Sequence, residues 1–477
     1  MVVFKVKALS MKFRISLFFP IFVFFLFQCA QADRVSFDSS SSAGLLFNAG
    51  FDFFRNATGK QITTFQFRAG DNQLLKDYVG TVTGNQILVQ GVPFGAVSHL
   101  RAAFESSTGA KVLVGGITQT SGVTRNDYSS PVSYEVVAGN GQKETYTVSV
   151  NVTVPITDAG QTDCFDALAS KIACGLGNFP GQDADVSGLA PILENAILTG
   201  DSSQPVVIDK NTGLIWKTCK EGTNPADCTA LAAPTLFTYS DAVAACSSLN
   251  GIGYAGLKDW RLPDLQEQFT LASYDSAAPY INTTIFPDGS QKYWSRSSAD
   301  PASTIARRWA FNFSNGNNDT IDEVNVLPVR CVSGGSYPAQ NFSDLGDGTI
   351  LDKNTNLLWQ KCSVGQSGSS CQNSGTTFFD WRDALVQCDS LATTGTPWRM
   401  PNVREYLSIA RYDLLMGTNG IDLGVFPGNI NTGSYWTSNV SQLAGNVGVF
   451  TFDVQYARLS KSDAIYTQVV RCVKDAP

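Results

Sequence analysis

More than half of the chain consists of one sequence pattern that occurs twice. Residues 209–219, DKNTGLIWKTC, return at residues 352–362 as DKNTNLLWQKC. Three later landmarks recur in the same order, at residues 260–263 and 398–401, 293–295 and 435–437, and 329–332 and 470–473. The period of about 140 residues is the length of a domain and exceeds the roughly 20–50 residues of solenoid repeats. Each copy is therefore predicted to own a hydrophobic core and to offer an equivalent binding surface.

The N-terminal residues have the pattern of an export signal. Lys12 and Arg14 precede a mostly apolar run at residues 15–27, which is too short to cross a bilayer core of about 30 Å. Residues 1–32 are therefore predicted to be a signal peptide, and the serine-rich residues 33–46 a flexible tether.

Two cleavage sites compete within this signal peptide. Residues 26–29 resemble a lipobox, which favours a lipidated Cys29 that anchors the protein at the cell surface or outer membrane. Residues 30–32 fit ordinary signal peptidase instead, and cleavage after Ala32 would give a secreted protein. The lipid anchor is the only membrane contact predicted, because no later segment is long and apolar enough to cross a bilayer.

Composition limits the partners and the compartment. The formal net charge is −7 at pH 7, and four of the basic residues lie in the signal peptide. Nucleic acid is therefore excluded as a partner, because its phosphates demand clustered basic side chains. Setting Cys29 aside leaves 10 of the 11 cysteines, an even number typical of disulfide-bonded proteins that fold outside the cytoplasm.

Residues 47–157 contain short β-branched or aromatic runs separated by Gly, Asn, Asp or Pro. Residues 145–152 alternate with period two, which is typical of a half-buried antiparallel strand. These runs predict an all-β, immunoglobulin-like sandwich. Residues 110–124 and 131–134 resemble a family of bacterial surface β-sandwiches that serve as spacers.

Residues 158–204 form a predicted connector with two cysteines. Cys164 and Cys174 flank an apolar stretch that looks helical. A straight helix would separate them by about 15 Å, beyond the roughly 4.4–6.8 Å that a disulfide spans between Cα atoms. A Cys164–Cys174 disulfide therefore requires a turn between the two residues, and we predict a stapled connector.

The two copies, residues 205–335 and 345–477, are each predicted to be an α+β domain. Each opens with a strand and continues with a helix, at residues 239–249 and 380–391, that carries a cysteine on its apolar face. A second helix follows each Trp-Arg-x-Pro turn, and a β-rich half completes the copy. The spacing of Asp264 and Glu267, and of Asn402 and Glu405, is that of a capping box at this second helix.

Each copy holds four cysteines, which allow three pairings. Two neighbouring cysteines flank a polar loop, and the other two join the first helix to the last strand. We therefore predict the disulfides Cys219–Cys228, Cys246–Cys331, Cys362–Cys371 and Cys388–Cys472. Each long disulfide would close a loop of roughly 85 residues and stabilise the fold by about 4 kcal/mol on a chain-entropy estimate.

A strand, two helices and a β-rich half with a helix-to-strand disulfide resemble the C-type-lectin-like fold. The Asp-x-x-Thr-x-Leu-x-Trp opening, the Trp-Arg-Leu/Met-Pro turn, the Tyr-Trp step and the closing Val-Arg-Cys-Val together resemble the C-terminal domain family of the bacterial collagen-like adhesin, Lcl. The resemblance implies a secreted or surface-exposed binding domain, and some members bind host glycosaminoglycans as trimers. This chain is acidic and has no Gly-x-y collagen stalk, so polyanion binding is not carried over and the oligomeric state stays open.

No catalytic, cofactor-binding or metal-binding residue is predicted. The only histidine, His99, lies in the predicted sandwich, which excludes a histidine-based zinc site or a Ser-His-Asp relay in the C-terminal half. Residues 344–349 contain acidic side chains but lack the alternating oxygen ligands of an EF-hand loop.

Two repeated residue types are candidates for ligand contact. Trp294 and Trp436 offer large aromatic contact areas at low entropic cost, although a repeated tryptophan more often belongs to the core. Arg330 and Arg471 are expected to point inward and pair with the capping-box glutamates rather than to bind a carboxylate ligand.

These observations predict a non-catalytic cell-surface binding protein or adhesin, with the sandwich as a stalk and two lectin-like modules that gain avidity from linked sites. The expected partner is a surface ligand, either a glycan or an extracellular-matrix protein. Two alternatives remain. One is a structural envelope protein without a host ligand, and the other is an enzyme of the formylglycine-generating type, which uses an unpaired cysteine pair with a bound metal.

Overall fold

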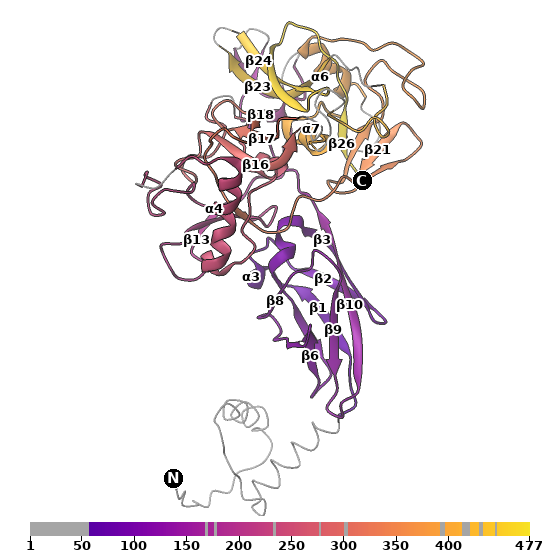
Figure 1. Cartoon of the computed structure of the whole chain (residues 1–477). Coiled ribbons are helices and arrows are strands. Elements are labelled where there is room, and N and C mark those ends of the chain that lie inside the picture. The colour runs from indigo at the N-terminus through magenta and orange to yellow at the C-terminus, as the bar shows by residue number, and fades with distance from the viewer. Residues whose placement is uncertain are drawn as a thin grey trace, which may run out of the picture.

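A computed structural model describes residues 57–477 except for residues 167–169, 176–178, 232–234, 276–277, 300–303, 392–395, 413–419, 429–432 and 444–445. The predicted signal peptide, the lipidation site Cys29 and the tether lie outside the described residues. Figure 1 shows an elongated N-terminal sheet that extends away from a larger C-terminal head. Within the described ranges, no helix is long and apolar enough to cross a membrane.

The N-terminal part is one curled sheet of eight strands. In spatial order these are β5 (Ala103–Ser106), β1 (Ile62–Phe67), β2 (Tyr78–Thr83), β3 (Gln86–Pro93), β10 (Lys143–Thr153), β9 (Val132–Val137), β6 (Lys111–Val114) and β7 (Ile117–Thr118). β3 and β10 run parallel, and the other neighbours are antiparallel. The sheet curls at β2, which pairs with β1 through its first two residues and with β3 through its last four. Inside the curl, the rings of Phe65 and Tyr134 lie 5.5 Å apart, edge to face.

Short elements complete this part and the connector that follows it. The N-terminal part adds α3 (Ala69–Asn72), the 3₁₀ helix η1 (Phe94–His99), β4 (Leu100–Arg101) and β8 (Arg125–Asn126). The connector contains the hairpin β11 (Cys164–Phe165) and β12 (Lys171–Ile172) and the 3₁₀ helix η2 (Asp183–Asp185).

The two sequence copies fold alike, each with two antiparallel sheets. The four-stranded sheets are β13 (Leu193–Ala196), β14 (Val206–Asp209), β15 (Ile215–Lys217) and β19 (Val332–Ser333), and β20 (Phe342–Asp344), β21 (Thr349–Asp352), β22 (Leu357–Gln360) and β26 (Val473–Asp475). The three-stranded sheets are β16 (Lys292–Ala299), β17 (Arg307–Asn312) and β18 (Asn317–Asp322), and β23 (Ser434–Leu443), β24 (Asn446–Asp453) and β25 (Arg458–Asp463). The edge strands β13 and β20 precede the predicted domain starts, because the chain before each copy folds back and pairs with its first strand.

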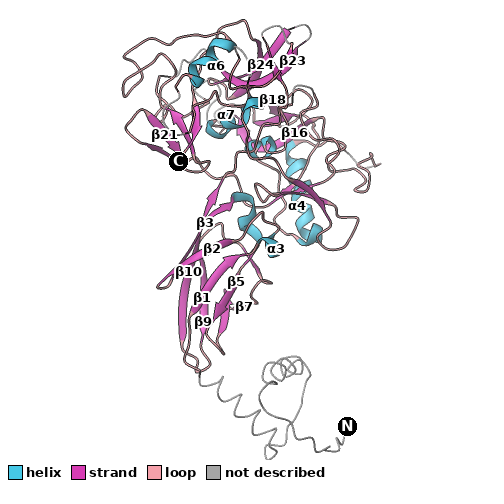
Figure 2. Cartoon of the chain, turned by 180° about the vertical axis from the view of Figure 1, so that it is seen from behind, coloured by secondary structure: helices cyan, strands magenta, loops and turns pink. Residues whose placement is uncertain are grey.

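The helices lie where capping residues place them. The first helices are α4 (Tyr239–Ile252) and α6 (Trp381–Asp389), and the second are α5 (Leu265–Phe269) and α7 (Val403–Ile409). Both second helices begin with the predicted capping box. A 3₁₀ helix, η3 (Tyr254–Gly256), follows α4. In Figure 2 most helices lie in the head, and the N-terminal part is almost entirely strand.

The structure forms the five predicted disulfides. They are Cys164–Cys174, Cys219–Cys228, Cys246–Cys331, Cys362–Cys371 and Cys388–Cys472. The connector cysteines have Cα atoms 5.2 Å apart, because the hairpin of β11 and β12 turns the chain between them. The long disulfides tie the first helix of each domain to the start of its last strand.

Each domain has a core of its own, as predicted, and the two domains also share a larger one that was not predicted. Each keeps a local cluster around its helix cysteine, but the largest cluster joins residues of both domains. At the boundary, the rings of Tyr280 and Phe450 lie 5.4 Å apart, and Lys461 Nζ donates to the Tyr280 hydroxyl at 2.9 Å. Trp309 meets Tyr412 edge to face at 5.3 Å. The head is therefore one body.

The N-terminal sheet is fitted to the first domain by close backbone approaches. Gly95 N in η1 donates to Thr212 O at 2.8 Å, and Gly335 N donates to Gly95 O at 2.9 Å. A Cβ atom at Gly335 would lie 2.3 Å from Phe94 O, and one at Gly95 would lie 2.7 Å from the Leu214 side chain. A side chain at either position would push the sheet and the head apart.

Asp259 adds a charged contact at the same junction. Ser98 Oγ donates to Asp259 Oδ2 at 2.6 Å, Ser333 Oγ donates to Oδ1, and His99 Nδ1 lies 3.8 Å from Oδ2. Burial would raise the pKa of Asp259, but the nearby His99 ring and the hydrogen bonds from Ser333 and Ser98 outweigh burial and hold the pKa well below its usual range.

Replacing Gly335 by alanine should loosen this junction. The new Cβ meets a backbone oxygen, so we expect Gly335→Ala to lower the free energy of unfolding by about 1–3 kcal/mol. Gly251→Ala, in α4 with open space around its Cβ, is the matched control and should be neutral or slightly stabilising. Thermal unfolding followed by circular dichroism measures both. Equal melting temperatures for Gly335→Ala and the parent would contradict the close approach.

The pH dependence of stability tests the Asp259 contact. Because the native pKa is depressed, the carboxylate stabilises the fold fully above the unfolded pKa of about 3.9, and this contribution is lost as the pH falls through the native value. Asp259→Asn should therefore lower the melting temperature at pH 7, and the difference should shrink below pH 4. Glu105→Gln, an exposed change in β5, is the control. A difference that stays constant at low pH would show that the carboxylate charge is irrelevant.

Candidate functional site

The two candidate ligand-contact tryptophans are core residues. Trp294 and Trp436 are fully buried, and their indole nitrogens donate at 2.8 Å to the carbonyl oxygens of Phe237 and Phe379, which precede the first helix of each domain. Neither ring is open to a ligand in this structure. The repeated tryptophans therefore hold the helix start against the three-stranded sheet. They belong to the core, which was the alternative to ligand contact.

Arg330 points inward as expected, but it pairs with a different residue from the one predicted. Arg330 forms an ion pair with Asp288 and donates to two backbone carbonyls, so it does not pair with Glu267. Glu267 instead binds both terminal nitrogens of Arg261, at 2.6 and 2.7 Å. In the second domain, Arg399 forms the equivalent ion pair with Glu405. In both domains the arginine of the Trp-Arg-x-Pro turn pairs with the capping-box glutamate, because that turn leads directly into the helix that carries the glutamate.

Both domains expose an apolar patch where two loops meet. The loop before the first helix runs beside the loop after the last strand of the three-stranded sheet, held by backbone hydrogen bonds between Phe237 and Leu327 and between Phe379 and Gln468. We define the first loop patch as Leu236, Val324 and Val326, which are 48%, 82% and 49% exposed. The second loop patch is Phe378, Ile465 and Tyr466, which are 51%, 66% and 63% exposed.

The loop patches occupy corresponding positions. Leu236 and Phe378 directly precede the paired phenylalanines, and Val324 and Ile465 each stand two residues beyond the three-stranded sheet. A lone exposed apolar side chain needs no explanation, but a patch at the same exposed place in both copies points to an interaction. These residues were not predicted from the sequence, although it shows apolar residues beside both capped helix starts.

The connector packs against one face of the second domain, so the two domains differ at that face. Phe179 lies 6.0 Å from the Trp381 ring, and Phe165 joins the same buried cluster of the second domain. At the corresponding position of the first domain, Tyr239 is half-buried and the Arg308 guanidinium lies 4.2 Å from its ring. The connector therefore covers a face of the second domain that stays open in the first.

A polar cavity of about 220 Å³ lies between the connector and the second domain. Its walls come from residues 156–158 and 186–189, from the start of α7 and from the chain end near β26. The charged side chains that line it are Asp158, Asp183, Glu405, Asp475 and Arg399. The cavity is therefore rich in carboxylates.

Asp183 is the least satisfied of these carboxylates. Its side chain is 3% exposed, and no donor reaches Oδ2 in hydrogen-bond geometry. Burial raises the pKa of Asp183 to about 7, with further raising by the negative charges of Asp158 and Glu405 and opposition from the amides of Asn439 and Asn402. An ionised Asp183 is therefore costly at neutral pH.

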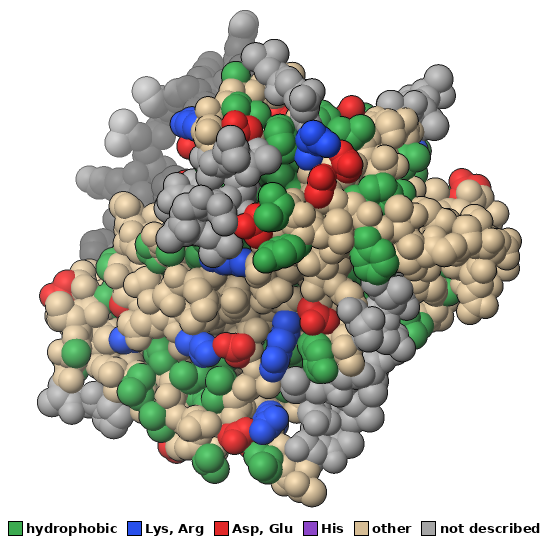
Figure 3. Space-filling view, turned by 90° about the horizontal axis from the view of Figure 1, so that it is seen from above, with side chains coloured by type: hydrophobic (Ala, Val, Ile, Leu, Met, Phe, Trp, Pro, Cys, Tyr) green, Lys and Arg blue, Asp and Glu red, His purple; other side chains and the backbone are tan. Residues whose placement is uncertain are grey.

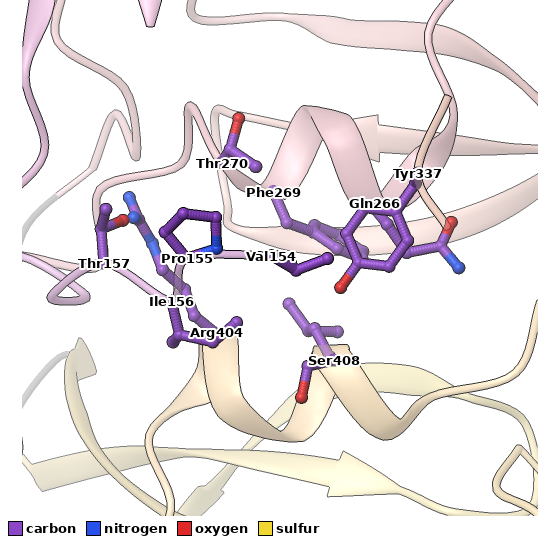
Figure 4. A pocket seen from close by; sticks show the side chains of 11 residues that line it. Val154, Pro155, Ile156, Thr157, Gln266, Phe269, Thr270, Tyr337, Arg404 and Ser408 are labelled. Carbon is purple, nitrogen blue, oxygen red and sulfur yellow. The ribbon is translucent and has the colours of Figure 1, made fainter. Parts of the chain in front are cut away.

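A smaller gap of about 30 Å³ lies between the two second helices. Figure 4 shows Gln266, Phe269 and Thr270 on one side and Arg404 and Ser408 on the other, with the chain at residues 154–157 between them. This volume suits about one water molecule. The gap marks where the domains pack around the linker, and it is too small for a ligand.

In the described part of the chain, the one group of side chains close enough together to hold a metal ion includes a disulfide. Cys164, Cys174 and Asp185 are the only His, Cys, Asp or Glu side chains there whose ligand atoms cluster closely enough. The two sulfur atoms are bonded to each other, so they are not the thiolates that bind metal.

The fold is that of a curled β-sheet domain joined to a tandem pair of domains, each of which contains two disulfides. The model of the Lcl C-terminal domain matches residues 205–333 and 348–474, which together make up more than half of the chain. The protein belongs to the Lcl C-terminal domain family and carries two copies of that domain. Residues 62–150, the curled sheet, match the SGBP N-terminal domain family.

Solved structures add little to this assignment. A candidate secreted protein of Bacteroides fragilis is 18% identical over 21% of this chain and 97% of its own, with a TM-score of 0.14. A candidate glycoside hydrolase of Bacteroides thetaiotaomicron is 13% identical over 60% of this chain and 85% of its own, with a TM-score of 0.17. Such low scores carry no argument about fold or activity. No curated protein matches the chain.

The raised pKa of Asp183 predicts that the free energy of unfolding falls as the pH rises, opposite to the usual effect of a carboxylate. Because its native pKa is raised, the fold favours the protonated carboxyl, and the associated stability is lost as the pH rises from about 4 through about 7. Asp183→Asn should therefore be more stable than the parent above pH 7, by up to about 4 kcal/mol, and equally stable near pH 4. Chemical unfolding at both pH values measures this. Asp319→Asn, at an exposed ion pair, is the control, and a less stable Asp183→Asn at pH 8 would refute the assignment.

Proposed function

We propose that the protein is an exported, non-catalytic surface-binding protein of the adhesin type, in which the N-terminal sheet is a stalk and two Lcl C-terminal domains form the head. The observation that carries this proposal is the recurrence of an exposed apolar loop patch in both domains. Patches of this kind mark interaction sites. Because the domains share a core, the two patches keep a fixed separation, and a ligand that reaches both gains affinity through effective concentration.

The proposal includes a fold for the N-terminal sheet and for each head domain. The two halves of the curled sheet face each other across a core, which supports an immunoglobulin-like stalk. The order of a four-stranded sheet, two helices and a three-stranded sheet, with a helix-to-strand disulfide, supports a C-type-lectin-like fold for each head domain.

The proposed location is the cell surface or outer membrane, with a lipid on Cys29 as the anchor, or the medium if cleavage follows Ala32. Five disulfides support folding in an oxidising compartment. The match of residues 62–150 to the SGBP N-terminal family also supports an exported or surface-exposed protein.

The proposed ligand is a glycan or an extracellular-matrix protein. Figure 3 shows basic and acidic side chains interspersed on the upper face of the head, without an extended basic area. Arg307, Arg308 and Lys292 on the first three-stranded sheet each pair with a carboxylate, which leaves little positive charge for a polyanion. The second loop patch offers aromatic rings, which stack on sugars or fill protein pockets at low entropic cost.

The two alternatives differ from this proposal in measurable ways. A formylglycine-generating type of enzyme needs an unpaired cysteine pair, whereas all ten cysteines in the described ranges are in disulfides. A structural envelope protein needs no ligand. Thiol titration therefore addresses the first alternative, and a binding screen addresses the second.

Binding should depend on the second loop patch. Residues 33–477, applied to an array of glycans and matrix proteins, should bind at least one class, and a Ile465→Ser, Tyr466→Ser double variant should weaken that binding by roughly ten-fold or more, as expected for loss of a hot spot. Both side chains are largely exposed, so stability should not change. Ile117→Ser, 67% exposed in the stalk strand β7, is the matched control.

Two outcomes would count against the proposal. Full binding by the double variant would remove the second loop patch from the binding surface. A folded protein that binds no member of the array would favour the structural alternative over the adhesin.

A further inference from the structure

The sequence duplication supplies an internal control for the carboxylate-rich cavity of the second domain. In the first domain, Asp264 at the α5 N-cap is held by Arg296, with two contacts of 2.6 and 2.7 Å. Arg296 N donates to Pro263 O, and Ser438 N donates in the same way to Pro401 O, so these two positions correspond. The second domain therefore has Ser438 where the first has an arginine.

The connector brings a carboxylate to this place without bringing a cation. Asp183 lies near Asn402, the N-cap of α7, and near Asn439, which follows the serine. Its side chain lines the cavity that Ser438 also lines. The carboxylate of the first domain has an intramolecular guanidinium, and the carboxylate of the second domain has none within hydrogen-bond reach of Oδ2.

The two nearby cations have other partners. Arg404 donates to Ala272 O and lines the smaller gap between the second helices rather than this cavity. Arg399 Nη2 donates to Glu405 and, at 2.9 Å, to Asp475, so it neutralises those two side chains. Asp158 accepts backbone hydrogen bonds from Gly160 and Gly188. Asp183 is thus the lining carboxylate that has no hydrogen-bond donor on Oδ2, and 3% of the residue stays exposed at the cavity that it lines.

We infer that this cavity binds the ammonium group of a small, hydroxyl-bearing amine such as an amino sugar. Asp183 would accept the ammonium in place of the missing arginine, and the Ser438 hydroxyl and other polar lining groups would contact hydroxyls. A cavity of about 220 Å³ exceeds the roughly 30 Å³ of one water and falls below the about 300–1,000 Å³ of drug-sized ligand sites.

A nitrogen cation fits better than a metal ion. Calcium takes six to eight oxygen ligands, whereas the described carboxylates here do not cluster into a group of three with close ligand atoms. An ammonium needs at most three acceptors and matches the guanidinium nitrogens that the first domain places here. The site is separate from both loop patches and goes beyond the proposed surface binding.

Binding should strengthen as the pH rises from about 5 to about 7.5, because Asp183 accepts an ammonium best when ionised. The charged groups that face it are Asp158 from the connector and Glu405 and Arg404 from α7. The negative neighbours favour a bound cation. An amino-sugar ammonium loses its own proton near about pH 7.7–8.0, like an α-amino group, so binding should level off and then fall above about pH 7.5.

The test uses glucosamine and glucose with residues 33–477 in isothermal titration calorimetry at pH 7.5. Glucosamine should bind and glucose, which has a hydroxyl in place of the ammonium, should bind at least ten-fold more weakly. Ethanolamine, an amine without the sugar ring, should bind with the same dependence on Asp183. Equal binding of glucosamine and glucose, or no binding of either amine, would overturn the inference.

Two variants locate the site. Asp183→Asn should weaken glucosamine binding at least ten-fold, and Ser438→Arg should do the same by restoring the cation that the first domain carries. Circular dichroism confirms that each variant is folded, and Asp183→Asn alone decides the question if Ser438→Arg does not fold. Unchanged binding by folded Asp183→Asn would refute the assignment, whereas the array result for the loop patches is independent of it.

Discussion

The packing of Tyr280 against Phe450 across the domain boundary is the contact on which the head depends. Aromatic side chains bury about 150–250 Å² each, which at roughly 25 cal/mol per Å² corresponds to about 4–6 kcal/mol per ring before entropic costs. Lys461 lies over both rings, at 4.7 and 4.9 Å, and adds a cation–π contact of about 0.5–2 kcal/mol. Asn318 fixes the register, because its amide donates to Ala457 O and its oxygen accepts from Leu459 N. Apolar burial holds the domains together, and the two hydrogen bonds of Asn318 set their orientation.

Comparing the two copies distinguishes the features that the fold requires from the features that are specific to one domain. The capping boxes, the buried tryptophans and the helix-to-strand disulfides perform the same task in both copies. The copies differ where the connector meets the second domain. There Trp381 replaces Tyr239 and packs under Phe179, and Ser438 replaces Arg296 beside the connector carboxylate. Under the connector, the second domain thus has a tryptophan in place of Tyr239 and a serine in place of Arg296.

The features that were predicted correctly are those that depend on the spacing of residues along the chain. The Asp264 and Asn402 caps need only residues three positions apart, and the Cys246 and Cys388 pairings follow from helix and strand order. The shared core, the docking of the connector and the Arg261–Glu267 pair were not predictable in this way. They depend on contacts between segments far apart in the chain, or on which of two arginines reaches a glutamate first. The loop patches were missed for a related reason, since an apolar residue in sequence does not reveal whether it is covered.

Asp183 shows how this architecture can hold a destabilising group. A carboxylate with a raised pKa opposes folding at neutral pH, so a sequence under selection for stability alone would replace it or supply a cation, as Arg296 does for Asp264. The shared core and the five disulfides give the head a reserve of stability against which one such group is tolerable. Residues that destabilise a fold cluster at functional sites. The missing arginine of the second domain therefore favours function over stability at that position, and the rigid head keeps the cavity open for it.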